Sequence, residues 1–356
     1  LMCLYISLDY FLSANVRKIS VREIDSYYIY NTCYIEMIME KLRIAVTGAA
    51  GNLGSLLSYG LLNENVNLNL LIHKKELPID ISEKENVSVH KVDLARQETL
   101  NDALKDVDII VHFAGILFMS NPEKFLPVTN TLYFSNLLDA AIRQNVKRII
   151  LISCPHVEGE SSPESPAKGS LKGKPISMHA KTRLEEERLL FHYAERFNFE
   201  PVSLRVGMVY GKGILMIDAA QWFARHWLLG VWKKPTHIHL ISKDDFVTAT
   251  IAAIIKPDIK GIYHVGDEGI QTLQQFLDDI TTYRNYHKPW RMPVWMIMTA
   301  ARTFELFSSI FGTQSPLTVD FIRIGMVSYY GDTTRMRKEL LPQLKYKTYK
   351  EGIHLF

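Results

Sequence analysis

The chain has few cysteines, no long apolar run and almost no net charge. Three cysteines, Cys3, Cys33 and Cys154, are spread over 356 residues. This sparse, odd count argues against a disulfide framework and favours a reducing, cytoplasmic compartment. No uninterrupted apolar run reaches about 18 residues, so no segment is typical of a membrane span. With 41 Lys and Arg against 38 Asp and Glu, the net charge is +3, too small to indicate a nucleic-acid partner.

Residues 1–39 differ from the rest of the chain. They contain no Gly and no Pro, but six Tyr without a clean period. Three basic residues between positions 17 and 22 follow the apolar stretch, whereas in a signal peptide they would precede it. We therefore expect an appended arm or an upstream translation artefact with the natural start at Met37 or Met39, the alternative being a helix that packs on the domain.

From residue 41 onward, short apolar strands alternate with helical segments. Residues 42–47 (LRIAVT) form a β-branched apolar run that suits a buried parallel strand. This alternation predicts an α/β fold, with a doubly wound parallel-sheet Rossmann domain over residues 41–206. A smaller C-terminal substrate lobe, interleaved with the same sheet, is expected over residues 207–356. The predicted strands are 42–47, 68–72, 87–92, 107–112, 148–153, 201–205 and 261–265, and the predicted helices 53–62, 127–144 and 176–197.

A glycine-rich turn joins the first strand to the first helix. Residues 47–54 read TGAAGNLG, with glycines spaced G-x-x-G-x-x-G. Gly48 permits a tight turn, Gly51 lets backbone amides approach a pyrophosphate, and Gly54 lets the helix pack close to the sheet. The free N–H groups at the helix start then favour phosphate. Because a strand precedes the turn and a helix follows it, the motif predicts a dinucleotide site, rather than a tight turn without a ligand.

The end of the second strand bears on which dinucleotide is bound. An acidic residue there would bind the ribose 2′-hydroxyl of NAD, whereas a cation would accept the 2′-phosphate of NADP. Here the chain reads His73-Lys74-Lys75, with no acid before Glu76. We therefore predict NADP(H), with NAD as the alternative, while noting that Lys74 and Lys75 would also suit a plain solvated loop. Asp93-Leu94 is expected beside the adenine, and Phe113-Ala114-Gly115 beside the nicotinamide ribose.

These residues together resemble the extended or atypical short-chain dehydrogenases/reductases, the group of nucleotide-sugar epimerases, dehydratases and 3β-hydroxysteroid dehydrogenases. The resemblance runs from about residue 41 to 354. It implies a hydride-transferring enzyme in which Asn130 supports the active site. Its motifs are TGAAGNLG at 47–54, VHFAG at 111–115, NTLYFSNLLDAA at 130–141, RVGMVYG at 205–211 and SKDD at 242–245. The expected cofactor residues are Gly48, Ala50, Gly51, Asn52, Leu53, Gly54, His73, Lys74, Asp93, Leu94, Phe113, Ala114, Gly115, Asn130 and Lys181; no metal site is expected.

The catalytic centre departs from the family pattern. Family members carry Tyr-x-x-x-Lys on a helix, where the lysine and the cofactor ribose lower the tyrosine pKa. Matching Lys181 to that lysine puts Ser177 at the tyrosine position, and a serine hydroxyl is much harder to deprotonate than a phenol. Cys154 stands where the family has Ser or Thr after the fifth strand. We name Lys181, Ser177 and Cys154 as the catalytic candidates, with the acid/base unassigned.

Three other residues are substitutes for the missing tyrosine. His179 is two residues before Lys181 and hence on a different helix face. His156 follows the fifth strand and Tyr210 the sixth, both at the open end of the sheet. A histidine titrates near neutrality and suits general acid/base work. For each of the three, a purely structural role is the alternative.

Two regions lie outside the strand–helix alternation. Residues 159–176, rich in Gly, Pro, Ser and Lys, have little apolar surface to bury, so we predict a mobile loop or lid. Trp222, Trp227 and Trp232 recur every five residues, which is no single helical face. Residues 293–311 predict a helix that packs on the sheet lobe, lines an apolar substrate pocket or touches a membrane surface.

The sequence thus predicts an NADP(H)-dependent oxidoreductase or epimerase/dehydratase-like enzyme acting on a small molecule. The alternative is a catalytically silent NADPH-binding structural or redox-sensing protein, which Ser177 favours. We expect no nucleic-acid partner and no transmembrane span, and leave open a peripheral membrane contact and a homodimer.

Overall fold

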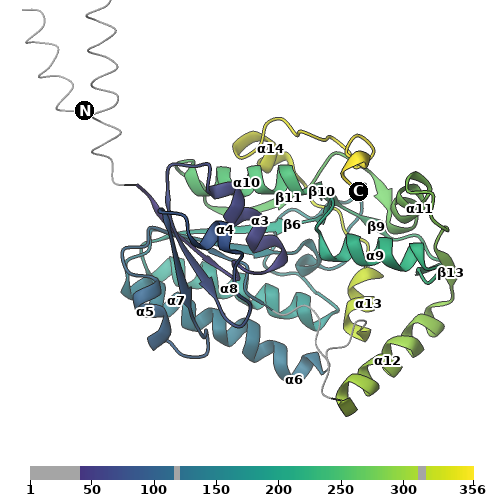
Figure 1. Ribbon diagram of the computed structural model, residues 1–356, viewed down its shortest axis with the longest axis horizontal. Coiled ribbons are helices and arrows are strands. Elements are labelled where there is room, and N and C mark those ends of the chain that lie inside the picture. The colour runs from purple at the N-terminus through teal and green to yellow at the C-terminus, as the bar shows by residue number, and fades with distance from the viewer. Residues whose placement is uncertain (1–40, 116–120, 312–317) are drawn as a thin grey trace, which may run out of the picture. The chain divides into compact units, whose positions relative to one another are not determined.

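A seven-stranded parallel sheet lies at the centre of the structure (Figure 1). The computed structural model describes residues 41–115, 121–311 and 318–356, so the expected arm at 1–39 lies outside the described residues. Residues 42–356 form one compact unit. Its sheet strands are β1 (Arg43–Thr47), β2 (Asn67–Ile72), β3 (Val87–Lys91), β4 (Ile109–His112), β5 (Arg148–Ser153), β6 (Glu200–Val206) and β11 (Gly261–Val265).

The strand order β11-β6-β5-β4-β1-β2-β3 confirms the predicted doubly wound fold. The chain runs outward from β1 to β3 and then continues on the other side of β1 with β4, where Val46 pairs with Val111. The order therefore reverses between β1 and β4. In open α/β sheets this reversal leaves a crevice at the carboxyl ends of the strands.

Helices cover both faces of the sheet (Figure 1). One face packs against α3 and α10 around residues such as Leu57 and Phe246, and the other against α5, α7 and α8 around residues such as Phe134 and Leu190. The helices on and between these layers are α3 (Asn52–Leu61), α4 (Ile79–Ser82), α5 (Glu98–Ala103), α6 (Pro122–Leu126), α7 (Tyr133–Arg143), α8 (Met178–Arg196) and α10 (Lys243–Ile255).

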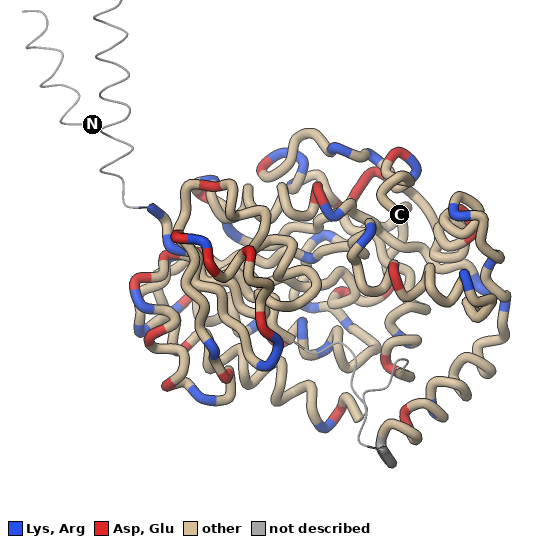
Figure 2. The backbone as a smooth tube through the Cα atoms, viewed as in Figure 1, with Lys and Arg blue, Asp and Glu red and all other residues tan. Residues whose placement is uncertain are grey.

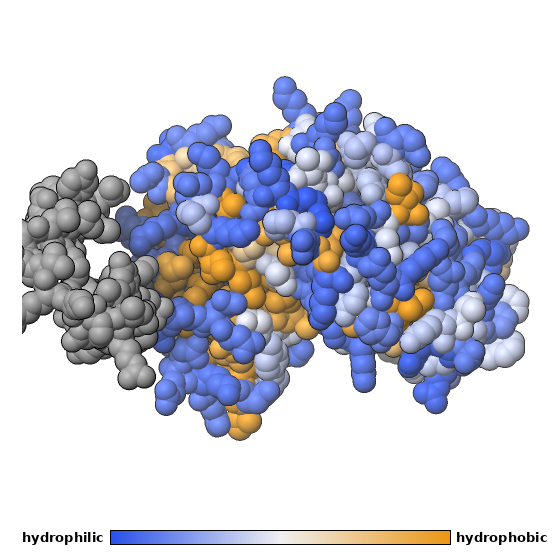
Figure 3. All heavy atoms as spheres, turned by 90° about the horizontal axis from the view of Figure 1, so that it is seen from above, coloured by the Kyte–Doolittle hydropathy of each residue, from blue (hydrophilic) through white to orange (hydrophobic). Residues whose placement is uncertain are grey.

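Lys and Arg alternate with Asp and Glu along most of the backbone (Figure 2). Seen from above, the molecule is mostly hydrophilic, with hydrophobic residues gathered in a band (Figure 3). Within the described part of the chain, no helix is long and apolar enough to cross a membrane.

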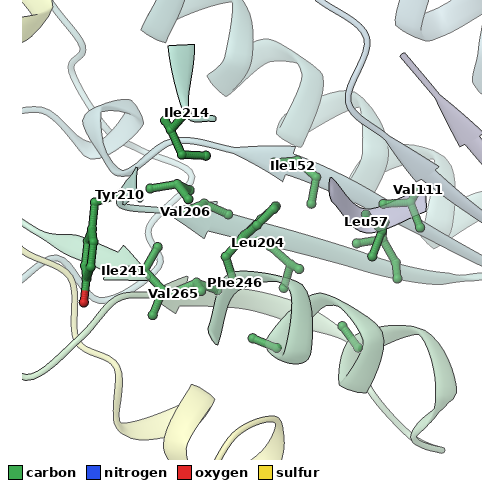
Figure 4. Close-up of a cluster of buried hydrophobic side chains, with 14 of the residues drawn as sticks. Leu57, Val111, Ile152, Leu204, Val206, Tyr210, Ile214, Ile241, Phe246 and Val265 are labelled. Carbon is green, nitrogen blue, oxygen red and sulfur yellow. The ribbon is translucent and has the colours of Figure 1, made fainter. Parts of the chain in front are cut away.

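The core on the α3 and α10 face continues into the C-terminal half of the chain. Leu204 and Val206 of β6 lie beside Phe246 of α10 and Val265 of β11 (Figure 4). The elements of this half are β7 (Met208–Tyr210), β8 (Gly230–Trp232), β9 (His237–Ile238), β10 (Leu240–Ser242), β12 (Gln271–Thr272), β13 (Trp290–Met292), α9 (Leu215–Arg225), α11 (Leu273–Tyr283), α12 (Val294–Phe311), α13 (Val319–Gly325), α14 (Thr334–Glu339) and the 3-10 turn η3 (Ile353–Leu355).

The helix predicted over 127–144 is not uniform. Residues Pro127–Leu132 form a π-helical segment, η1, and only then does the α-helix α7 begin. Pro127 stands at the first position of η1, where its missing N–H costs nothing. A π turn rotates the side chains that follow it and is common at functional sites; here it contains buried Asn130.

The segment 159–176, predicted as a mobile loop or lid, has hydrogen bonds to fixed parts of the fold. It follows the 3-10 turn η2 (Pro155–Glu158). The backbone N–H of Ser161 donates to the carbonyl of Ser328, and that of Ala167 donates to the carbonyl of Tyr330. Backbone hydrogen bonds thus hold this segment in place, although it has few apolar side chains. Its composition alone did not indicate these hydrogen bonds.

Candidate active site

The glycine turn forms a bare backbone cradle at the carboxyl end of β1. Gly48 has φ +70°, a left-handed conformation that favours glycine. A Cβ on Gly51 would come within 2.9 Å of the Gly48 carbonyl oxygen, and one on Gly54 within 2.2 Å of the same atom. Gly51 caps α3 without a side-chain hydrogen bond, so the first N–H groups of α3 stay available for an anion. The residues present therefore fit a dinucleotide pyrophosphate.

Asn52 links this cradle to the C-terminal half of the chain. Its side-chain Nδ2 donates to the Gly213 carbonyl at 2.7 Å, and its Oδ1 accepts the Leu215 N–H at 2.8 Å. Gly213 also donates its N–H to Asp218. The loop before α9 consequently lies against the helix start at which a phosphate would bind.

A hollow of about 410 Å³ opens at the ends of β2 and β3. Asp93 and Lys74, both predicted as cofactor residues, line this hollow, whereas Lys75 does not. His73 holds its Nδ1 3.0 Å from the Val92 carbonyl, so Nδ1 carries the proton. The lining consists of His73, Lys74, Lys91, Val92, Asp93, Arg96 and Thr99. Four of these seven residues are basic or imidazole groups, which suits a dianionic phosphate.

Helix α8 presents two faces, and the predicted Lys181 lies on the outer one. Lys181 is exposed, while His179 and Arg183 are buried. His179 and Arg183 are four residues apart and lie about 40° apart around the helix, whereas Lys181 and Arg183 are about 160° apart. Lys181 therefore points away from the buried side of α8, which holds His179 and Arg183.

Arg183 reaches the crevice between β1 and β4. Its Nη2 lies 2.3 Å from where a Cβ of Gly115 would stand, immediately after β4. Its Nη1 forms an ion pair with buried Glu186 at 2.6 Å. The positive charge of Arg183 also lowers the pKa of His112, second to burial. Arg183 was not among the residues selected from the sequence. The signal that could have found it is His179 four residues earlier, because this is the spacing of the family Tyr-x-x-x-Lys motif.

Ser177 serves as the N-cap of α8. Its hydroxyl oxygen accepts the Ala180 N–H at 3.2 Å. The carboxylate of Asp320 on α13 accepts the N–H groups of Met178 and His179 at 2.8 and 3.1 Å. Three otherwise unpaired N–H groups of the first helical turn are thereby satisfied, as helix starts require. This capping bond accounts for a serine at position 177 without any proton transfer.

Asn130 of η1 contacts α8 through its side chain. Its Nδ2 donates to Thr182 Oγ1 at 3.2 Å, in the buried layer next to Arg183. Thr182 Oγ1 in turn donates to the His179 carbonyl. Asn130 therefore supports the turn of α8 that holds His179 and Arg183, in line with the supporting place that the resemblance implies for it.

The candidates after β5 are poor proton donors or nucleophiles. Burial raises the pKa of the Cys154 thiol to about 12, although the nearby charge of Arg183 opposes this. Burial lowers the pKa of His156 to about 4, and its ring packs against Tyr329 at 4.2 Å. Both groups are thus neutral at physiological pH, and Cys154 lacks the thiolate that nucleophilic attack needs.

Tyr210 belongs to the core of the C-terminal half. Its ring stacks on Phe356 with centroids 5.5 Å apart, and burial, followed by the charge of Asp267, raises its pKa. Asp267, just past β11, is 1% exposed. Burial raises the pKa of this carboxyl from 3.8 to about 8, against the hydrogen bond from the Gly269 N–H.

A buried ion network holds α8 to the sheet. Arg205 of β6 pairs with Glu187 at 2.6 Å, both fully buried, and also with Glu158. Burial opposes ionisation of Glu158, but the hydrogen bond with His264 and the charge of Arg205 lower its pKa to about 2. Arg205 further donates to the Ser170 carbonyl at 3.0 Å. This network fixes the position of α8 along strands β5 and β6.

Sequence comparison finds relatives that cover different lengths of the chain. A 29% identical relative over 165 residues is the uronate dehydrogenase of Pseudomonas syringae, with 46% of this chain and 58% of the relative covered. An uncharacterized protein of Methanocaldococcus jannaschii is 26% identical over 270 residues, covering 69% of this chain and 82% of the relative. The chain thus spans little more than half the length of the uronate dehydrogenase.

Solved structures share the fold. The UDP-glucuronic acid 4-epimerase of Bacillus cereus, in complex with UDP-glucuronic acid and NAD, superposes with a TM-score of 0.70 at 18% identity, covering 88% of this chain and 97% of the epimerase. The profile of the NAD dependent epimerase/dehydratase family matches residues 44–266. These matches confirm the prediction of an NAD(P)-dependent enzyme of the oxidoreductase or epimerase type and give no support to the catalytically silent alternative. The chain belongs to the NAD dependent epimerase/dehydratase family.

Proposed function

We propose that this protein is an NADP(H)-dependent oxidoreductase or epimerase that acts on a hydroxyl or carbonyl carbon of a sugar or nucleotide sugar. The observation that carries the proposal is the bare glycine cradle, with buried Arg183 beside the crevice at Gly115. The sugar class is supported by the uronate dehydrogenase and UDP-sugar epimerase relatives. Bound nicotinamide would supply or accept a hydride, and the chain would have to bind the substrate and move its proton.

The preference for NADP follows from the hollow at the ends of β2 and β3. No acidic residue follows β2 at the position that would bind a ribose 2′-hydroxyl; His73 and Lys74 stand there instead. Arg96, which sequence analysis did not select, lines the same hollow. Its contact with Asp93 at 3.5 Å is long and exposed, so its guanidinium is available to a phosphate.

Adjacent lysines provide a matched test of this preference. Lys74→Asp should weaken NADPH binding by on the order of tenfold or more, because one charge-assisted contact is lost and a like charge is introduced. Lys75→Asp changes the net charge equally but lies outside the lining, so it should have little effect. Calorimetric titration of both variants with NADPH and NADH measures this. Equal losses in the two variants, or NADH bound more tightly by the unmodified protein, would overturn the preference.

We further propose that His179 and Arg183 take the places of the family tyrosine and lysine. The two residues have the same spacing of four, lie on the buried side of α8, and are supported by Asn130 through Thr182. In the oxidative direction, the substrate hydroxyl would lose its proton to the His179 imidazole while its carbon loses a hydride. Arg183 would hold the cofactor ribose near Gly115. An imidazole titrates in the range that this proton transfer needs.

Paired variants separate the two roles. Arg183→Gln should weaken NADPH binding, followed by its fluorescence, while Lys181→Gln should not. His179→Gln should bind NADPH normally but lose turnover with sugar and nucleotide-sugar substrates, together with any histidine limb of the pH–rate profile. If Lys181→Gln weakened binding and Arg183→Gln did not, the assignment would return to Lys181. A His179→Gln variant with full turnover would exclude the imidazole.

A further inference from the structure

Helix α12 carries its apolar side chains outward. Ala301 and Ser308 are buried on its inner side, and Glu305 accepts the Val319 N–H there. Trp295 is 68% exposed and Leu306 64% exposed. The other large apolar side chains exposed on α12 are Val294, Met296, Phe304 and Phe307. The helix projects along one end of the unit and is mostly uncharged in Figure 2. A helix of this pattern leaves a large apolar surface in contact with water.

A cluster of aromatic rings continues this surface. The Trp290 indole N–H donates to the Trp227 carbonyl at 2.8 Å, and the His287 ring stacks between the two at 4.3 and 4.9 Å. Because β13 pairs with β8 and is followed directly by α12, these rings adjoin the start of the helix. Trp222 and Leu228 are 54% and 61% exposed nearby on and after α9. We call α12 together with segment 222–228 and Trp290 the aromatic surface.

The charges around the aromatic surface are mainly positive. The segments 215–236 and 286–311, which contain the aromatic surface and its neighbours in sequence, hold six Lys and Arg but only two Asp and Glu. Arg225, Lys233, Lys234 and Arg302 are exposed, and Arg291 pairs with Asp278. The whole chain has a net charge of only +3, so the cations are concentrated beside the exposed tryptophans.

We propose that the aromatic surface docks on an anionic lipid bilayer. Tryptophan side chains favour the bilayer–water interface, since the ring is apolar and the N–H is polar. Neighbouring Lys and Arg are attracted to anionic headgroups. A second copy of this chain is a poorer occupant, because a two-fold contact would bring together two surfaces that both carry an excess of positive charge. No helix crosses the bilayer in this arrangement, in agreement with the described helices.

The tryptophans themselves report on this proposal. Of the five in the chain, Trp222, Trp227, Trp290 and Trp295 lie on the aromatic surface, and only Trp232 is buried. Vesicles of phosphatidylcholine with 30% phosphatidylserine should therefore shift the intrinsic fluorescence to the blue and co-sediment with the protein. Lipids brominated near the headgroup should quench this emission. Phosphatidylcholine vesicles alone, or 1 M NaCl, should weaken the binding strongly.

Two sets of variants test the apolar and the charged contributions. Trp295→Ser with Leu306→Ser should lower vesicle binding, whereas the equally exposed controls Ile79→Ser with Ile270→Ser should not. Neutralising Arg225, Lys233 and Lys234 to Gln should weaken binding by on the order of a hundredfold, whereas Lys105, Lys338 and Lys350 to Gln should not. NADPH binding in solution should be unchanged in every variant, so a failure here is separable from a failure of the proposed function.

Three outcomes would overturn the docking proposal. One is absence of binding to phosphatidylserine vesicles at low salt. Another is equal binding by the surface and control variants. The third is a blue shift that depends on protein concentration without lipid and accompanies a dimer in gel filtration, which would assign the aromatic surface to a second copy.

Discussion

Asp267 makes the stability of this protein depend on pH in an unusual direction. Its carboxyl is buried just past β11, and burial raises its pKa from 3.8 to about 8. In the unfolded chain the group ionises near pH 4. Between these two values the folded state holds a proton that the unfolded state has lost, so the free energy of unfolding falls as the pH rises. The contribution is fully present below pH 4 and is lost progressively up to about pH 8.

The magnitude follows from the size of the shift. Each pH unit in this window removes about 1.4 kcal/mol, so about 4 kcal/mol is lost between pH 5 and pH 8. Asp267→Asn cannot ionise and lacks this dependence. Guanidinium denaturation of both proteins at pH 5, 6, 7 and 8 gives the difference, with the exposed Asp102→Asn as the control. The free energy of unfolding of Asp267→Asn, relative to that of the unmodified protein, should increase with each step up in pH. The reasoning would be refuted if the difference in free energy of unfolding between the two proteins did not change with pH. It would also be refuted if the unmodified protein gained stability relative to Asp267→Asn as the pH rises.

Three further predictions concern the cradle and α8. Gly51→Val should abolish NADPH binding in calorimetry while the far-ultraviolet spectrum stays native, because a valine side chain would fill the bare turn that a pyrophosphate approaches, starting from a Cβ 2.9 Å from the Gly48 carbonyl oxygen; retained affinity would remove the cradle from the cofactor site. Arg205→Leu should lower the free energy of unfolding by about 3–5 kcal/mol, since Glu187 stays buried without its cation, whereas Lys91→Leu at an exposed pair should change it little; equal effects would contradict the network. Ser177→Ala should cost about 1 kcal/mol in thermal unfolding through the lost cap, with turnover kept; a large loss of turnover at unchanged stability would restore Ser177 as a proton-transfer group.

The sheet was predictable because most of its strands carry short apolar stretches, the clearest being RIILIS in β5, whereas β3 (VSVHK) alternates with polar residues. Residues 148–153 and 261–265 were predicted with the bounds that the structure has, and the remaining sheet strands differ by one or two residues at their ends. Buried parallel strands need such runs irrespective of tertiary detail. The π turn at Pro127–Leu132 was not predictable, because a single proline at the helix start fits an α-helix equally well.

The glycine turn was predictable from sequence, whereas the side chains that α8 buries were not. Glycines at 48, 51 and 54 act through the backbone, which leaves a signature in sequence. Lys181 and Arg183 are both cations two positions apart, and only the rotation of α8 decides which one is buried. That rotation depends on long-range contacts: Asp320 at the helix start and Arg205 at Glu187. From the sequence, the family tyrosine and lysine were matched to Ser177 and Lys181. The fold buries a different pair, His179 and Arg183, which lies two residues further along α8.

The late strand β11 has a consequence for how the chain reaches its native state. It pairs along its whole length with β6, although about 55 residues separate them in sequence. A nascent or proteolysed chain that ends near residue 206 would leave the hydrogen-bonding edge of β6 open, with Val202 and Leu204 uncovered. Such an edge is a template for aggregation. The smallest fragment worth expressing on its own should thus extend past Val265, which is also where the family match ends.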